Sequence, residues 1–132
     1  MKKPRLIAIV DDEKAVCRAI SRLVISAGLE AEMFSSAEEF LRSSRERRPD
    51  CLILDLRLPG INGLELQQKL ATDHCRIPIV VVSAHDDPAS RRQALQNGAF
   101  VFLGKPFNDE ALLEALHSAM KPETAKRGSD QH

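Results

Sequence analysis

The 132-residue sequence lacks an excess of charge of either sign, a long apolar run and a secretion signal. Nineteen basic and nineteen acidic residues cancel, so no overall field would draw the chain to nucleic acid or to a membrane surface. No apolar stretch approaches the ~20 residues of a membrane span, and the opening Met-Lys-Lys-Pro leads into a strand-like run and not into a signal-peptide pattern. We therefore expect a cytoplasmic protein that contacts neither membranes nor nucleic acid directly.

Cysteine and glycine patterns that carry chemistry are also missing. Cys17, Cys51 and Cys75 are odd in number and have no Cys-x-x-Cys spacing, which favours reduced thiols over a disulfide framework. No glycine-rich phosphate loop is present, which disfavours a nucleotide-binding module. What remains is a single domain, long enough to bury roughly two-thirds of its unfolded surface.

Five short segments have the composition of β-strands. Four lack polar alternation, which is typical of strands buried on both faces of a parallel sheet; these are residues 5–10, 51–54, 79–82 and 100–103. The runs at 5–10 and 79–82 are also rich in β-branched residues. A shorter strand is expected at 30–34. Stretches with helical periodicity lie at residues 16–27, 36–45, 62–72, 88–97 and 108–120. The alternation predicts a doubly wound α/β domain over residues 5–120, with helices on both faces of a five-stranded parallel sheet.

Two parts of this pattern are weak. The helix predicted at 88–97 has an apolar face of little more than Ala89, Ala94 and Leu95, so we expect it to be poorly anchored. Residues 121–132 carry no large apolar side chain and are expected to be a disordered tail or the start of a linker.

Ionisable or hydroxyl side chains follow four of the predicted strands. In chain order these are Asp11 and Asp12, then Asp55, Ser83 and Lys105. Because the carboxyl ends of parallel strands meet at one edge of the sheet, we expect these groups to lie close together. Clustered carboxylates suit a hard cation such as Mg²⁺ or Mn²⁺. Lys105 and Ser83 could bind the oxygens of a phosphoryl group beside that metal, and Asp55 is the candidate nucleophile that would form an acyl phosphate.

Taken singly, each of these residues has an ordinary structural interpretation. The paired aspartates can cap a helix, and Asp55 can initiate the turn that comes after it. Ser83 can be a structural hydroxyl, and Lys105 a surface lysine. Only their joint placement at the ends of successive core strands favours a phosphoryl site.

Four segments resemble, in order and spacing, the receiver domain of two-component response regulators: Asp11-Asp12, Asp55-Leu-Arg-Leu-Pro-Gly-Ile-Asn-Gly63, Val82-Ser83-Ala84 and Lys105-Pro106-Phe107. The resemblance implies a flavodoxin-like fold with sheet order 2-1-3-4-5. It also implies that Asp55 accepts a phosphoryl group from a histidine kinase or phosphotransfer protein. Mg²⁺ would be held by Asp12, Asp55 and the backbone carbonyl of Arg57, with Asp11 contributing through water.

The resemblance further implies a phosphorylation-controlled switch and not a turnover enzyme. Phosphorylation would draw Ser83 inward and open space for Phe102, which stands at the family's switch-aromatic position but lacks the hydroxyl of the frequent tyrosine. Its switching would then rest on packing alone, and the alternative is an ordinary core phenylalanine. The surface formed by residues 88–97, 100–103 and the last helix would change and bind a partner or a second copy of the chain.

We expect the Lys105–Pro106 peptide bond to be cis. The Lys105 amine must point back across the sheet edge toward Asp55, while the chain starts a helix at Asn108 only a few residues later. An X-Pro bond loses only ~0.5–1 kcal/mol on becoming cis, so the fold can select that isomer.

Two questions stay open from the sequence alone. An aspartyl-phosphate phosphatase would also place a nucleophilic aspartate after a core strand, but Asp55-Leu56-Arg57 lacks the second carboxylate of the Asp-x-Asp pattern of such enzymes. The Asp55 segment resembles receivers that precede a helix-turn-helix domain in transcription regulators. Residues 121–132 do not distinguish a stand-alone receiver from the N-terminal part of such a regulator.

Overall fold

The computed structural model describes residues 4–43 and 48–121. Its five strands are β1 (Leu6–Val10), β2 (Glu30–Phe34), β3 (Cys51–Leu54), β4 (Ile79–Ser83) and β5 (Val101–Gly104). The helices between and after them are α1 (Lys14–Ser26), α2 (Ala37–Arg42), α3 (Gly63–Thr72), α4 (Pro88–Gln96) and α5 (Asp109–Ala119). The strands pair in parallel in the order β2-β1-β3-β4-β5. The expected fold and sheet order are therefore confirmed.

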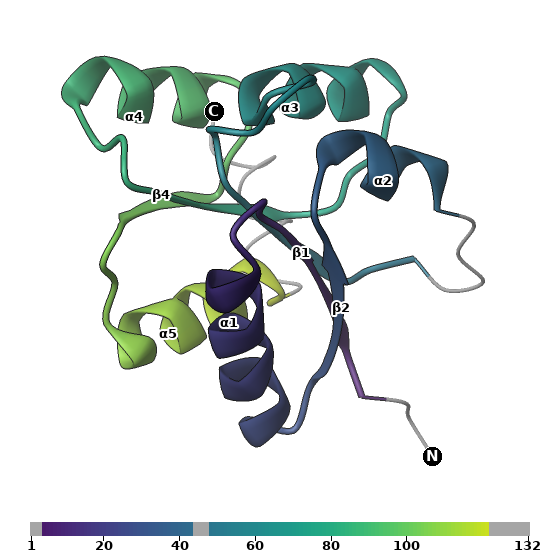
Figure 1. Ribbon diagram of the computed structural model, residues 1–132, viewed down its shortest axis with the longest axis vertical. Helices are drawn as coiled ribbons and strands as arrows, with labels where there is room; N and C mark the ends of the chain where they lie inside the picture. The colour runs from purple at the N-terminus through teal and green to yellow at the C-terminus, as the bar shows by residue number, and fades with distance from the viewer. Residues whose placement is uncertain (1–3, 44–47, 122–132) are drawn as a thin grey trace.

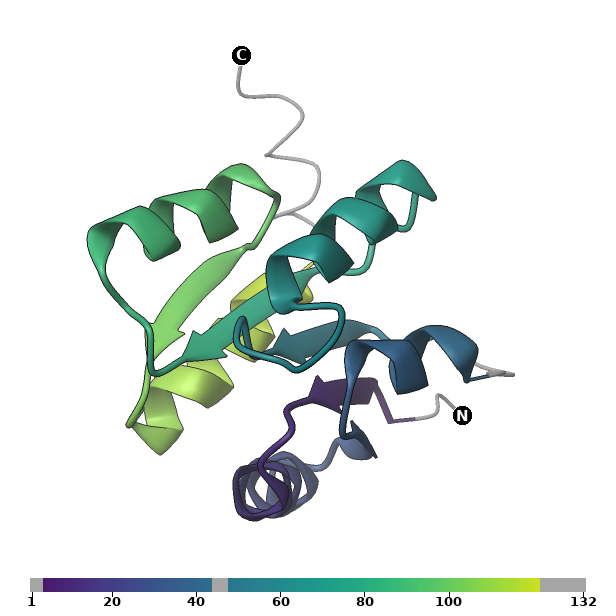
Figure 2. The ribbon, with the colours of Figure 1, turned by 45° about the horizontal axis from the view of Figure 1, so that its top comes forward.

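Helices cover both faces of the sheet, as Figures 1 and 2 show: α2, α3 and α4 lie on one face, and α1 and α5 on the other. An apolar layer packs between the sheet and each set of helices. Successive residues of each central strand point into opposite layers. In β1, Ala8 and Val10 join the layer under α2 to α4, whereas Ile7 and Ile9 join the layer over α1 and α5. All four are fully buried. Burial on both faces explains why these strands show no polar alternation.

Several predicted boundaries were wrong by one to three residues. The helix expected over 36–45 is α2, which ends at Arg42, because Ser43 is extended and its hydroxyl donates a hydrogen bond to the Phe40 carbonyl. Residues 44–47 lie outside the described part of the chain. The strand expected from residue 100 begins at Val101, and Phe100 is 39% exposed although its N–H donates to the Ile79 carbonyl.

Helix α4 is held weakly, as expected. Among its residues, all of them described, only Ala94 is buried, and Leu95 is 44% exposed. One polar contact ties it to α3: the buried Gln67 amide donates from Nε2 to the Ala94 carbonyl at 3.0 Å. Arg91 connects it to β5 through a ring contact and a main-chain hydrogen bond. A helix with so few apolar contacts can shift at small energetic cost.

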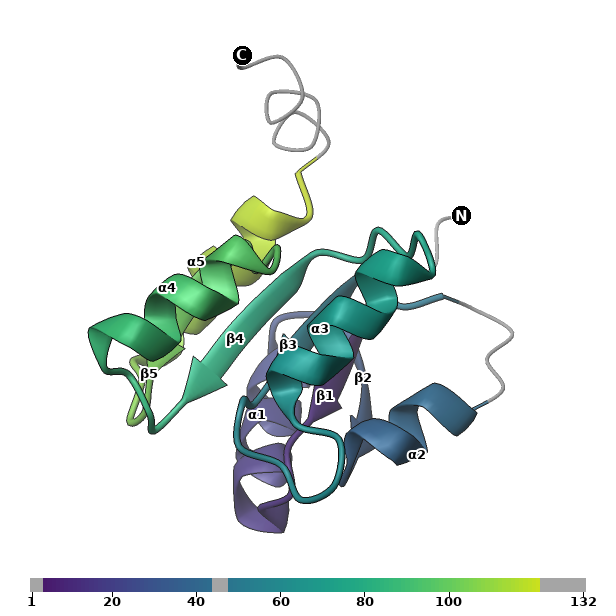
Figure 3. The ribbon, with the colours of Figure 1, turned by 90° about the horizontal axis from the view of Figure 1, so that it is seen from above.

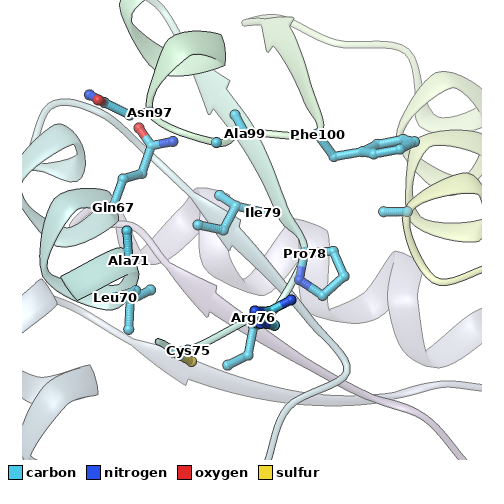
Figure 4. A pocket seen from close by; sticks show the side chains of 13 residues that line it. Gln67, Leu70, Ala71, Cys75, Arg76, Pro78, Ile79, Asn97, Ala99 and Phe100 are labelled. Carbon is cyan, nitrogen blue, oxygen red and sulfur yellow. The ribbon is translucent and has the colours of Figure 1, made fainter. Parts of the chain in front are cut away.

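A pocket of about 500 Å³ lies between α3, the start of β4 and the end of α4. Figure 4 shows Gln67 at one side, with its amide beside Asn97 and Ala99, and Arg76 and Pro78 at the other. Pro78 directly precedes β4, so the pocket opens at the amino-terminal edge of the sheet. It therefore lies at the opposite end of β4 from Ser83.

No helix in residues 4–43 and 48–121 is long and apolar enough to cross a membrane. All three cysteines fall in these ranges and are free thiols, as expected. The tail predicted for residues 121–132 lies, apart from Lys121, outside the described residues.

Candidate functional site

Two buried carboxylates lie side by side at the carboxyl edge of the sheet. Asp11 directly follows β1 and Asp55 directly follows β3, and these neighbouring strands pair Val10 with Leu54. The Asp55 N–H donates to the Val10 carbonyl at 3.1 Å, which continues the pairing to the end of the strands. Asp11 is 3% exposed and Asp55 is 6% exposed. Strand pairing therefore decides how close these two acids lie.

Asp12 completes an acidic cluster with them. It is exposed, but one carboxylate oxygen from each of Asp11, Asp12 and Asp55 lies within 4.8 Å of the others. Three carboxylates converging on one point form an oxygen-only donor set, which is what Mg²⁺ and Mn²⁺ prefer. The residues present therefore fit a hard divalent cation.

Lys105 brings a positive charge into the same cluster. Its Nζ donates to Asp11 at 2.9 Å and to Asp55 at 3.2 Å. Pairing of Ser83 with Gly104 carries β5 to this edge, and the Lys105 N–H donates to the Ser83 carbonyl at 2.9 Å. The Lys105–Pro106 peptide bond is cis, as expected. The amine thus bridges two acids that come from two different strands.

Burial and charge act in opposite directions on this cluster. Burial raises the pKa of Asp11 above its usual value, although the Lys105 hydrogen bond and the Glu13 backbone N–H offset part of the rise. Burial by itself would lower the pKa of Lys105, but Asp11 and Asp55 more than compensate and raise it. Lys105 is therefore a fixed ammonium at neutral pH. A fixed positive charge beside a carboxylate suits the binding of an anionic group.

Ser83 lies at the same edge but faces its own loop. It is fully buried, and its hydroxyl accepts a hydrogen bond from the His85 N–H at 3.1 Å. Within the described residues its hydroxyl makes no hydrogen bond to the aspartates or to Lys105. The side chains of His85 and Arg57 are exposed, and the Arg57 N–H donates to Asp55 at 3.1 Å. The predicted role of Ser83, binding a phosphoryl oxygen, therefore stays a prediction.

Sequence reasoning missed Glu13 as a member of the cluster. Its carboxylate lies 3.3 Å from the Lys105 amine and is 62% exposed, and its N–H donates to the Asp11 carboxylate at 2.9 Å. The signal was available, since Asp11, Asp12 and Glu13 form an unbroken acidic run after β1. The lysine therefore meets three carboxylates, one of them largely in solvent.

Phe102 is buried at 4% exposure, and a residue that sequence reasoning missed covers its ring. The Arg91 guanidinium of α4 lies 4.7 Å from the ring centroid, within cation–π range. The same side chain donates to the Phe102 carbonyl at 3.3 Å. Arg91 thus ties α4 to β5 through the ring and through the backbone.

Comparison with known proteins settles the family. The model of the response regulator receiver domain matches residues 7–117, which is most of the chain. The chain belongs to the response regulator receiver family. This receiver is 45% identical to response regulator protein TmoT of Ectopseudomonas mendocina over 88% of the chain and 53% of TmoT. It is 37% identical to the DNA-binding transcriptional regulator NtrC of Klebsiella pneumoniae over 79% of the chain and 22% of NtrC.

A solved structure supports the same assignment. The structure of response regulator StyR superposes with a TM-score of 0.81 at 40% identity, covering 97% of this receiver and 64% of StyR. The chain spans about half the length of TmoT and less of NtrC. The shared part is thus the receiver of two-component signalling, in which receivers interact with histidine kinases.

Proposed function

We propose that the protein is a phosphorylation-dependent signalling switch in which Asp55 is the phosphoacceptor. The observation that carries this proposal is the convergence of Asp11, Asp55 and the Lys105 ammonium within hydrogen-bonding distance. An Asp55 oxygen would attack phosphorus while the donor's bond to phosphorus, in a histidine kinase or phosphotransfer protein, breaks. Positioning and charge neutralisation supply most of the rate in such transfers.

Each residue of the cluster has a separate task in this scheme. Asp11, Asp12, Asp55 and the Arg57 carbonyl would hold Mg²⁺, which supplies charge neutralisation of the phosphoryl oxygens when bound. Lys105 would neutralise an oxygen on the other side. Ser83 would bind a third oxygen after its hydroxyl turns away from the His85 N–H, from which it now accepts a hydrogen bond.

The protein is proposed to store the phosphoryl group and not to turn over substrate. The residue two positions after Asp55 is Arg57, whose side chain is exposed, so no carboxylate stands where the general acid and base of an aspartyl-phosphate phosphatase would be. Arg57 and His85 would instead flank the path of attacking water and influence how long the acyl phosphate lasts.

Treatment with acetyl phosphate should label the protein at Asp55 and only when Mg²⁺ is present. Without the metal, transfer places the phosphoryl charge beside unneutralised carboxylates. Mass spectrometry of proteolytic fragments would locate the modification, with a chelator-treated sample as the control. Full labelling in chelator, or labelling at a residue remote from the cluster, would contradict the assignment.

The proposed output surface is formed by α4, β5 and α5. Support comes from the thin apolar contacts of α4 and from Arg91, which ties that helix to the candidate switch residue Phe102. Because Arg91 of α4 contacts Phe102, a shift of Phe102 would move Arg91 and change the surface of α4. The result is an equilibrium between two packings that phosphorylation biases.

Hydrogen exchange should change first on this surface when a phosphoryl mimic binds. Adding beryllofluoride and Mg²⁺ is expected to alter exchange in residues 88–104 and in α5, because the weakly held helix α4 is tied through Arg91 to the candidate switch residue Phe102 on β5. The same additions to an Asp55→Asn variant serve as the control. A change confined to residues 13–43 would rule this surface out.

The partner at this surface is proposed to be another protein domain: a second copy of the receiver, or an output domain that controls transcription. NtrC, one of the relatives, is a DNA-binding transcriptional regulator. The balanced charge of the present chain argues against nucleic-acid binding by the receiver itself. Free thiols at all three cysteines fit a reducing compartment, so the proposed location is the cytoplasm.

A further inference from the structure

The loop between β3 and α3 carries both Asp55 and the candidate metal ligand at Arg57. Its two ends are closed by local hydrogen bonds. The Arg57 N–H donates to the Asp55 carboxylate at 3.1 Å, and the Gly63 N–H donates to the Leu56 carbonyl at 2.9 Å. Asn62 and Glu65 complete a capping box at the start of α3. Between these closures Leu58 is buried and Ile61 packs against the core, and the Ile61 N–H finds its hydrogen-bond partner elsewhere in the chain.

Glu38 of α2 supplies that partner. One of its carboxylate oxygens accepts a hydrogen bond from the Ile61 N–H at 2.9 Å, across 23 positions of sequence. Figure 3 shows the loop beside the first turn of α2. The contact lowers the pKa of Glu38, with the Ile61 hydrogen bond as the largest cause. The Glu38 carboxylate is thus in its charged, accepting form at neutral pH.

Gly60 makes the close approach possible. It has a φ of +74°, a conformation that L side chains rarely adopt, and a Cβ built at this position would overlap the Glu38 carboxylate. The loop tip and Glu38 are therefore in direct contact along two successive residues. A substitution at Gly60 would disturb both the turn and the contact.

The first turn of α2, which carries Glu38, is anchored in the core. Its neighbours Ala37 and Phe40 are fully buried in the core, and the rings of Phe34 and Phe40 meet edge to face at 5.3 Å between centroids. Helix α2 begins at the Ser36 cap, whose hydroxyl accepts the Glu39 N–H. The Glu38 carboxylate therefore adds a polar contact to a loop tip whose Ile61 side chain also packs against the core.

We propose that Glu38 is a positioning residue for the metal and phosphoryl site: it holds the tip of the β3–α3 loop so that the Arg57 carbonyl faces the acidic cluster. The inference rests on the proposed role of that cluster. Glu38 itself touches neither metal nor phosphoryl group. Its effect passes through the backbone from Ile61 to Arg57, in the way that outer residues orient the ligands of a metal site.

The chain offers a matched control in Glu39. It lies in the same first turn of α2 and carries the same charge, but its carboxylate accepts from the N–H and hydroxyl of Ser35, at 2.7 and 3.0 Å. It does not contact the loop through any hydrogen bond among the described residues. A Glu39 variant therefore measures the effect of removing a carboxylate from this helix turn while the Glu38 contact to the loop remains.

The test compares Glu38→Ala, Glu38→Gln and Glu39→Ala with the wild type. Amide exchange at Ile61 is measured by NMR in the metal-free protein, and Mg²⁺ affinity is measured by titration without a phosphodonor. Glu38→Ala should exchange Ile61 faster and bind Mg²⁺ about 10-fold more weakly, the lower end of the effect of outer residues on metal affinity. Glu38→Gln keeps an acceptor oxygen and should lie closer to the wild type. Glu39→Ala should match the wild type in both measurements.

Three results would count against the inference. Faster Ile61 exchange in Glu38→Ala with unchanged Mg²⁺ affinity would show that the contact does not position the site. Unchanged Ile61 exchange in the same variant would lead to the same conclusion. An equal loss of affinity in Glu39→Ala would reveal a general effect of α2. A wild-type protein that fails to bind Mg²⁺ would instead overturn the proposed function, so the two failures are distinguishable.

Discussion

Replacing Asp55 by asparagine is expected to abolish phosphoryl labelling. Asparagine has nearly the same shape, but its amide oxygen is a poor nucleophile and carries no charge to help hold a cation. The neighbouring Asp11 is not expected to replace Asp55 as the phosphoacceptor. It follows a different strand, and its carboxylate accepts hydrogen bonds from Lys105 and from the Glu13 N–H. Labelling with acetyl phosphate, followed by intact-mass measurement, would show this as loss of the modified species.

The Asp55→Asn protein should remain folded. The change removes one of three clustered carboxylates, so without Mg²⁺ the variant is expected to be at least as stable as the wild type. Thermal unfolding with and without Mg²⁺ checks this, and the metal should stabilise the variant less. A Glu13→Gln protein is the matched control and should still be labelled, because Glu13 is 62% exposed. Labelling that survives in Asp55→Asn would refute the phosphoacceptor assignment.

Substituting Lys105 by methionine should slow labelling by about 100-fold, the loss typical when one group that stabilises developing negative charge is removed. Methionine keeps much of the aliphatic length but has no ammonium to place beside the phosphoryl oxygens. The metal site should survive, since the three aspartates are untouched. The initial rate of labelling at saturating Mg²⁺ is the measurement, and a rate within a few-fold of wild type would argue against Lys105 as a phosphoryl-binding group.

Stability provides a second check on Lys105. Without Mg²⁺, Lys105→Met leaves Asp11 and Asp55 buried without their cation, which should cost about 1–3 kcal/mol, less than for a fully buried pair because the site opens to water. Added Mg²⁺ should restore part of the loss. The deficit should also shrink at lower pH, because Asp11, whose pKa burial already raises, can then take up a proton. Urea unfolding at several pH values would test the sign.

The sequence by itself determined the architecture and the members of the charged cluster at the sheet edge. Strands such as Ile79–Ser83 are apolar without alternation, which only a sheet covered on both faces accommodates. Parallel strands then bring the residues after their carboxyl ends to one edge, so Asp11, Asp55 and Lys105 were predictable as neighbours. The cluster could be predicted because strand direction and pairing decide it.

Contacts between side chains of distant elements were decided only by the tertiary structure. Two such contacts are the hydrogen bond from Ile61 to Glu38 and the contact of Arg91 with the Phe102 ring. Each joins two elements far apart in the sequence, and no sequence pattern predicts that these side chains meet. For Ser83, the position at the edge of the sheet was predictable, but the hydrogen-bond partner of its hydroxyl was not. A strand's position depends on backbone pairing and apolar pattern. The direction of a polar side chain depends on which hydrogen-bonding groups the packed helices and loops bring within about 3 Å, and those distances exist only in the folded chain.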